Sequence, residues 1–212
     1  MGRPVGNVSE PLLVIIAHHS RLDQAYSLAG RVGAAHVSVD YESRGARWGH
    51  LQALRWASAR RERVWIIEDD ALAPTDFLDR ASEWSARFPT DLVSGYLGRQ
   101  RPPQFQGQIR SKLAAAEARG LDWLTLPTLI HGVCYSIPTG SVGRVVRDLP
   151  SGAADYAVGQ AWGRPPIYTI PSLVDHADGL PVERHPDGQT RRPGRTAWRP
   201  PKGVQDELDY AG

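Results

Sequence analysis

Three adjacent carboxylates, Glu68, Asp69 and Asp70, are the residues whose type and spacing most directly suggest chemistry. Neighbouring carboxylates repel one another unless a cation, arginine side chains or water offset their charge. Hard cations such as Mn²⁺ and Mg²⁺ prefer carboxylate and phosphate oxygen atoms. The cluster therefore predicts a site where a metal on Asp70 bridges a diphosphate while Glu68 takes a ribose hydroxyl. The alternative is a solvated acidic turn that caps the following helix.

The four uncharged residues 64–67 lead directly into the cluster and fit a buried strand. Because side chains alternate along a strand, Glu68 and Asp70 would face one side and Asp69 the other, provided that the strand continues so far. Similar runs elsewhere predict an alternating α/β chain. Strands are expected at 12–17, 35–40, 64–67, 91–96, 130–137 and 168–170, and helices at 22–31, 50–57, 77–88, 111–119 and 155–162.

Two segments between these elements are predicted to be loops. Gly45 and Gly49 bracket the first, just before the helix expected at 50–57. The second is an excursion over 99–108, where two prolines and several glutamines are poor material for a core.

Polar residues follow the first three predicted strands at the points where those strands end: 18–21, Asp40, and the acid cluster. In open α/β sheets, ligands bind beyond the carboxyl ends of the strands. These groups should therefore meet at one site, although loops after strands are commonly polar for other reasons.

Residues 64–77 resemble the D-x-D region of glycosyltransferases with the GT-A fold, especially families related to lipopolysaccharide-type glycosyltransferases. The aliphatic strand, the acid cluster and the Pro74 and Asp76-Phe77 helix start carry this resemblance. Segments 18–21, Asp40 and 171–176 follow in the same order, so the resemblance covers roughly 12–178. It implies a Rossmann-like, mixed and largely parallel sheet flanked by helices. It also implies metal-dependent transfer from a nucleotide sugar, first of all a UDP-sugar, to an acceptor hydroxyl.

The resemblance also implies roles for individual residues. Asp70 would bind Mn²⁺ or Mg²⁺, and His176 would be a further metal ligand that favours manganese. Arg21 and Asp40 would touch the nucleotide. The donor site would be completed by Glu68 and by His18 and Asp69. The alternatives are a polar residue closing a strand for His176 and an ordinary loop histidine for His18.

Asp155 is the candidate catalytic base. It opens the predicted helix at 155–162 and resembles the aspartate at the start of a late helix in inverting GT-A enzymes. Direct displacement needs a group that takes the acceptor proton, and a carboxylate suits that task. The alternative is an aspartate that satisfies backbone amides at the helix start, which would leave a retaining mechanism open.

The chain is predicted to divide into a catalytic domain at 11–180 and a Pro/Gly-rich tail at 181–212. Few large aliphatic residues occur in the tail, so it should add little to the core. It could close over the donor diphosphate, hold DNA by its phosphates, or only keep the chain soluble. Between 184 and 202 its one acid is Asp187, and its six basic residues are Arg184, Arg191, Arg192, Arg195, Arg199 and Lys202.

Composition sets the remaining limits. The 212 residues carry a net charge of +2, too small to demand a nucleic-acid or membrane partner. The lone Cys134 cannot form an intramolecular disulfide, and no secretory signal or membrane span is evident, so a cytoplasmic protein without membrane insertion is expected.

The acceptor is left open by the sequence. In its small size the chain resembles phage-encoded glycosyltransferases. Acceptors of such enzymes include a hydroxymethylated base in phage DNA, a virion protein or a glycan. Other function classes are a nucleotidyltransferase and a non-catalytic sugar- or DNA-binding module. The former normally carries a glycine-rich phosphate loop, and none follows Ala17.

Overall fold

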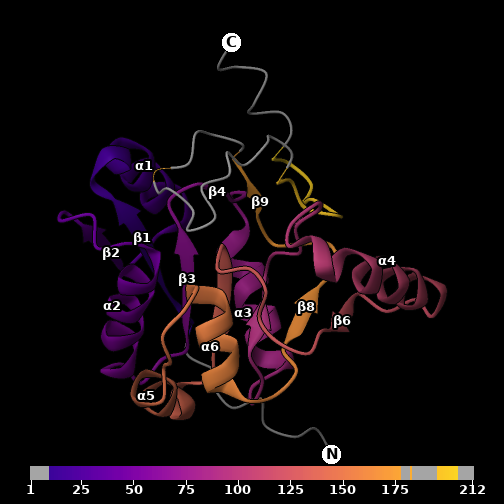
Figure 1. Cartoon of the computed structure of the whole chain (residues 1–212). Helices are drawn as coiled ribbons and strands as arrows, with labels where there is room; N and C mark the ends of the chain where they lie inside the picture. Colours follow the sequence, from indigo (N-terminus) through magenta and orange to yellow (C-terminus); the bar gives the residue numbers. More distant parts are fainter. Residues whose placement is uncertain (1–9, 178–181, 183–194, 205–212) are drawn as a thin grey trace, which may run out of the picture.

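A seven-stranded mixed sheet runs through the centre of the computed structural model, which describes residues 10–177, 182 and 195–204 (Figure 1). The strand order is β2-β1-β3-β7-β5-β8-β6, and a separate pair joins β4 to β9. The strands are β1 Leu12–His18, β2 His36–Asp40, β3 Val64–Glu68, β4 Ala71–Leu72, β5 Val93–Ser94, β6 Trp123–Thr125, β7 Cys134–Ile137, β8 Ile167–Thr169 and β9 Asp175–His176.

The expectation of a mixed, largely parallel sheet is confirmed. Strand β1 pairs in parallel with β2 and β3, and β7 is antiparallel to both β3 and β5. Strand β5 therefore runs in the same direction as β3, and β8 is parallel to β5. Only β7 and β6 run in the opposite direction, since β6 is antiparallel to β8.

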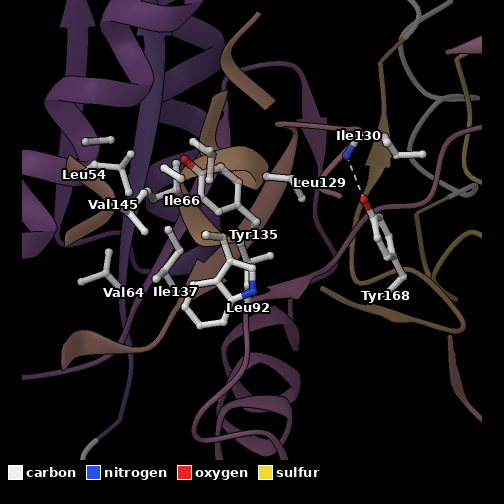
Figure 2. Packing of buried hydrophobic residues seen from close by; sticks show 14 of the residues in the cluster. Leu54, Val64, Ile66, Leu92, Leu129, Ile130, Tyr135, Ile137, Val145 and Tyr168 are labelled. Carbon is white, nitrogen blue, oxygen red and sulfur yellow. Dashed lines mark hydrogen bonds between the residues drawn. The ribbon is translucent and has the colours of Figure 1, made fainter. Parts of the chain in front are cut away.

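Helices cover both faces of the sheet because successive strand residues point to opposite sides. Leu13 and Ile15 pack toward α1 and α3, whereas Val14 and Ile16 pack toward α2, α5 and α6. Figure 2 shows part of the core on the face of Val14 and Ile16, with Tyr135 among aliphatic side chains. The helices are α1 Leu22–Val32, α2 Ala46–Ser58, α3 Phe77–Arg87, α4 Pro103–Ala118, α5 Thr139–Arg147 and α6 Ala154–Trp162, with a short 3₁₀ turn at His19–Arg21.

The predicted loop between Gly45 and Gly49 is wrong, because Gly49 lies inside α2. A Cβ atom at Gly49 would come 2.7 Å from Ile16 Cγ2. The glycine therefore lets the helix approach β1 closely, and it does not break the helix.

The predicted excursion over 99–108 is also wrong beyond residue 102, because α4 begins at Pro103. Proline suits the first helical position, where no intrahelical N–H bond is lost. Gln106, which suggested a loop, is buried and donates to the carbonyl oxygens of Gly98 and Arg101 at 3.2 and 2.9 Å. Helix α5 and strand β6 have no counterpart among the expected elements.

Residues 195–204 of the predicted tail pack against the domain. Ala197 is fully buried and forms a bridge with Gly98, and Val204 is also buried. The Trp198 amide donates to the carbonyl oxygen of Leu97 at 2.8 Å. The expectation that the tail adds little to the core is therefore wrong for these residues, while the domain boundary at 180 stays a prediction.

No helix in the described ranges is long and apolar enough to cross a membrane.

Candidate functional site

One cavity of about 1030 Å³ lies beyond the carboxyl ends of β1, β2 and β3. These ends meet because the three strands are adjacent and parallel, so the polar residues that follow them share one edge of the sheet. All the site residues expected from the sequence line this cavity: His18, Arg21, Asp40, Glu68, Asp69, Asp70, Asp155 and His176.

The three carboxylates of the acid cluster do not point to alternating sides as the sequence suggests. Strand β3 ends at Glu68, so Asp69 and Asp70 lie in a turn and face the same partner. Arg21 Nη1 lies 3.0 Å from Asp69 Oδ1 and 2.8 Å from Asp70 Oδ2. The backbone amide of His18 also donates to Asp69 Oδ2 at 2.8 Å. The expected grouping of Asp70 with Glu68, which required the strand to continue to residue 70, is therefore wrong, because Asp70 shares Arg21 with Asp69.

Arg21 supplies part of the charge compensation that the sequence assigns to a metal. Burial works against its charge, but Asp70 and Asp69 outweigh that effect and raise the pKa of Arg21 further. Burial also raises the pKa of Asp69, to which the charge of Asp70 adds. Arg21 therefore stays cationic and ties the two turn carboxylates to the start of α1.

The short β4–β9 pair brings His176 to Asp70. Ala71 lies opposite His176 in this pair, which places His176 Nε2 3.5 Å from Asp70 Oδ2. Asp70 Oδ1 is buried and has no hydrogen-bond partner among the residues that the structure describes. An unpartnered carboxylate oxygen beside an imidazole fits a divalent cation.

No group of three or more His, Cys, Asp or Glu side chains among the described residues could hold a metal. The described part of the chain thus offers two ligands, Asp70 and His176, and oxygen atoms of a diphosphate and water could fill other positions.

Glu68 belongs to a separate buried chain of hydrogen bonds. Its Oε1 lies 2.9 Å from His50 Nε2, and His50 Nδ1 lies 3.0 Å from the Tyr135 hydroxyl. Burial favours the neutral form of Glu68, but the hydrogen bond and charge of His50 outweigh it and lower the pKa. A Cβ atom at Gly132 would come 2.9 Å from both Glu68 Oε1 and His50 Nε2, so only glycine fits over this pair. Sequence reasoning missed His50, whose signal was that of an ordinary residue in an amphipathic helix.

Asp40 is held by the backbone of the turn that follows β2. Its Oδ2 accepts from the Gly45 amide at 2.8 Å and its Oδ1 from the Glu42 amide at 3.3 Å. Burial opposes ionisation, but these amides and that of Arg44 outweigh it and lower the pKa of Asp40. Asp40 is therefore a fixed anion at the wall of the cavity.

Asp155 lies in the first turn of α6 and lines the same cavity. Its Oδ1 accepts from the Tyr156 amide at 2.8 Å, and the N-cap of the helix is Ala153. Burial raises the pKa of Asp155, and the negative charge of Glu68 adds to this effect. A carboxylate with a raised pKa in a cavity is a candidate for proton transfer.

The sequence indicated Arg21 and a basic tail, but not the other arginines that the fold brings to the cavity wall. Of the tail residues, Arg195 lines the cavity, whereas Arg199 forms an ion pair with Glu117. Arg184, Arg191 and Arg192 lie outside the described residues. Apart from Arg21, the remaining arginines that line the cavity come from the loops after β2 and β5 and from the start of α2: Arg44, Arg47, Arg99 and Arg101.

No protein-family model and no curated protein sequence matches this chain. The residues and geometry of the cavity are therefore the basis for assigning a function.

Proposed function

We propose that the protein is an inverting glycosyltransferase of the GT-A type. It transfers a sugar from a nucleotide sugar to an acceptor hydroxyl with the help of Mn²⁺ or Mg²⁺. A UDP-sugar is the first donor to test. One observation carries the proposal: every residue selected from the sequence for donor, metal or base chemistry lines the same cavity. Its volume of about 1030 Å³ is at the upper end of small-molecule sites and suits a nucleotide sugar with part of an acceptor.

The donor half of this site is the part built on β1, β2 and β3. Asp70 and His176 would hold the metal, which when bound supplies positive charge to the departing diphosphate. Arg21 holds Asp70 and Asp69 in place and keeps their combined negative charge partly neutralised. Asp40 and Glu68 are ionised hydrogen-bond acceptors suited to ribose hydroxyls.

The acceptor half is the part next to α6. The acceptor oxygen forms a bond to the anomeric carbon while the bond from that carbon to the diphosphate breaks. Asp155 takes the hydroxyl proton on Oδ2, because Oδ1 already accepts from the Tyr156 amide. A single displacement of this kind inverts the anomeric configuration.

The test is calorimetric binding of UDP to the purified protein with Mn²⁺ and with excess chelator. Binding should require the metal, because Asp70 and the diphosphate repel each other without it. Asp70→Asn should weaken the Mn²⁺-dependent affinity at least tenfold and leave the folded state intact. Asp76→Asn is the matched control, since Asp76 is an exposed carboxylate that pairs with Arg80 at the surface.

Enzymatic function is scored separately, as release of UDP from UDP-sugars with Mn²⁺ present. A nucleotidyltransferase would release pyrophosphate from a nucleoside triphosphate, and a binding module would release neither product. Equal UDP affinity in excess chelator would reject the metal site, and normal affinity of Asp70→Asn would move the donor site elsewhere.

A further inference from the structure

A second, smaller hollow of about 400 Å³ adjoins the main cavity. The two share Arg99 and Pro103, so the same two residues border both hollows. The described residues that line it include two arginines and no carboxylate: Arg99, Gln100, Pro103, Gln106, Gly107, Arg110 and Trp198.

Gln106 makes this hollow a built feature of the fold. Its side chain is buried, and its amide nitrogen donates to the carbonyl oxygens of Gly98 and Arg101. Its Oε1 accepts from Trp198 Nε1 at 3.0 Å. One amide therefore ties the loop after β5 and helix α4 to residue 198. Because the single indole N–H of Trp198 is satisfied, the ring offers apolar surface to a ligand, and it is only partly buried.

Three arginines form a basic track from the cavity into the hollow: Arg101, Arg99 and Arg110. The structure shows no hydrogen bond or ion pair for any of these three guanidinium groups within the described residues, whereas nearby Arg199 is paired with Glu117. Arg99 and Arg110 are exposed. Three positive charges along one path, without a partner in the described part of the chain, favour an anionic ligand that extends beyond the cavity.

We propose that this track binds a single-stranded nucleic acid, with phosphates on the three arginines and one base stacked on Trp198. A basic path beside an aromatic ring is the combination that holds single strands without reading their sequence. A neutral glycan needs no such charge. The role of this strand as the acceptor, whose target nucleotide enters the main cavity, rests on the proposed function. A nucleotide inside a duplex could not reach the cavity without leaving the base stack, which is why a single strand fits better.

The experiment measures fluorescence anisotropy of a labelled 12-nucleotide single-stranded DNA on the full chain at several salt concentrations. Arg99→Gln/Arg110→Gln should weaken binding at least tenfold and reduce the slope of log affinity against log salt by about 1.4, the value for two lost phosphate contacts on a single strand. Arg55→Gln is the matched control, because Arg55 is exposed on α2 and lines neither hollow.

Trp198 separates nucleic acid from a general anion. Trp198→Leu should weaken oligonucleotide binding about tenfold, whereas Trp198→Phe, which keeps an aromatic face, should weaken it much less. Thermal melting of each variant excludes unfolding as the cause. If oligonucleotide binding depends on the arginines but Trp198→Leu and Trp198→Phe have equal affinities, the assignment to nucleic acid is overturned. Binding that does not respond to the arginines, or responds equally to Arg55→Gln, would overturn the track.

Failure of the proposed function gives a different result. If the unaltered chain releases no UDP from UDP-sugars but its oligonucleotide binding depends on the arginines and Trp198, the track stands and the transferase proposal fails. If UDP is released and the oligonucleotide does not bind, the transferase proposal stands and the track fails.

Discussion

His50 Nε2 lies 2.9 Å from Glu68 Oε1, and this contact joins helix α2 to the carboxyl end of β3. His50 is 1% exposed, and the Tyr135 hydroxyl fixes its other ring nitrogen. Glu68 thereby has a different partner from Asp69 and Asp70, which share Arg21. Three consecutive carboxylates can coexist at one cavity because two separate groups of the protein compensate their charge.

Two substitutions of His50 should distinguish its contact with Glu68 from its packing. In His50→Gln the side-chain amide nitrogen can take the place of Nε2 and still donate to Glu68, whereas the shorter chain of His50→Asn cannot reach it. We expect His50→Asn to lower the free energy of unfolding by about 2 kcal/mol more than His50→Gln, the scale of a hydrogen bond to a charged group. Urea unfolding measures the difference. Equal losses in the two variants would show that packing alone matters at this position.

The position of the site could be predicted from the sequence, but its internal pairing could not. The uncharged run before Glu68 marks a strand end, and parallel strand ends gather at one edge of a sheet. Which partner each carboxylate takes depends on Arg21 and His50, which are 47 and 18 residues before Glu68 in the chain. No local pattern reports such tertiary contacts.

Two segments were predicted wrongly because their local composition is polar or rich in turn residues. They surround Gln106 and Ala197, and both residues are buried. Gln106 bonds to Trp198, and Ala197 forms a bridge with Gly98, so the two segments cover each other. Tertiary packing overrides weak local preference in such segments. The strands β1 and β3 carry strong aliphatic runs, and their positions were predicted correctly for the same reason that they form the core.

Stability should fall on acidification because of His131. Burial is the main cause that lowers its pKa from 6.5 to about 4, opposed by its bond to the Arg101 carbonyl. Between these two pH values the unfolded chain binds a proton at this histidine and the folded protein does not, so the free energy of unfolding decreases as pH falls through the window. The loss should approach roughly 3 kcal/mol.

His131→Gln isolates this contribution, because glutamine can donate to Arg101 but does not titrate. The difference in unfolding free energy between the two proteins should change between pH 7 and pH 4, as measured by urea unfolding at each pH. A difference that stays constant over this range would contradict the assignment to His131.

Deleting 195–212 should destabilise the protein by about 2–4 kcal/mol, or roughly 5–15 °C in melting temperature. The deletion removes the buried Ala197 and Val204 and the partly buried Trp198. Deleting only 205–212 is the matched control, because that truncated chain keeps residues 195–204. Equal melting temperatures for the two truncated chains would mean that 195–204 contribute little to the core.

Asp155→Asn should leave UDP and Mn²⁺ binding intact and lower sugar transfer by about 10²-fold or more, the usual scale for removing a general base. Asparagine keeps the size of the side chain but cannot accept the hydroxyl proton. Asp148→Asn is the matched control, because Asp148 is exposed and pairs with Arg147 outside the cavity.

The pH dependence of transfer provides an independent check on Asp155. A base must be ionised to act, so activity should rise with pH through the pKa of Asp155. Because burial and the charge of Glu68 raise that pKa, the rise should occur above the ordinary aspartate value of 3.8. The product should carry the inverted anomeric configuration, which an NMR coupling constant reports. Retention of configuration, together with near-normal transfer by Asp155→Asn, would reject single displacement and leave Asp155 as a residue that only stabilises the start of α6.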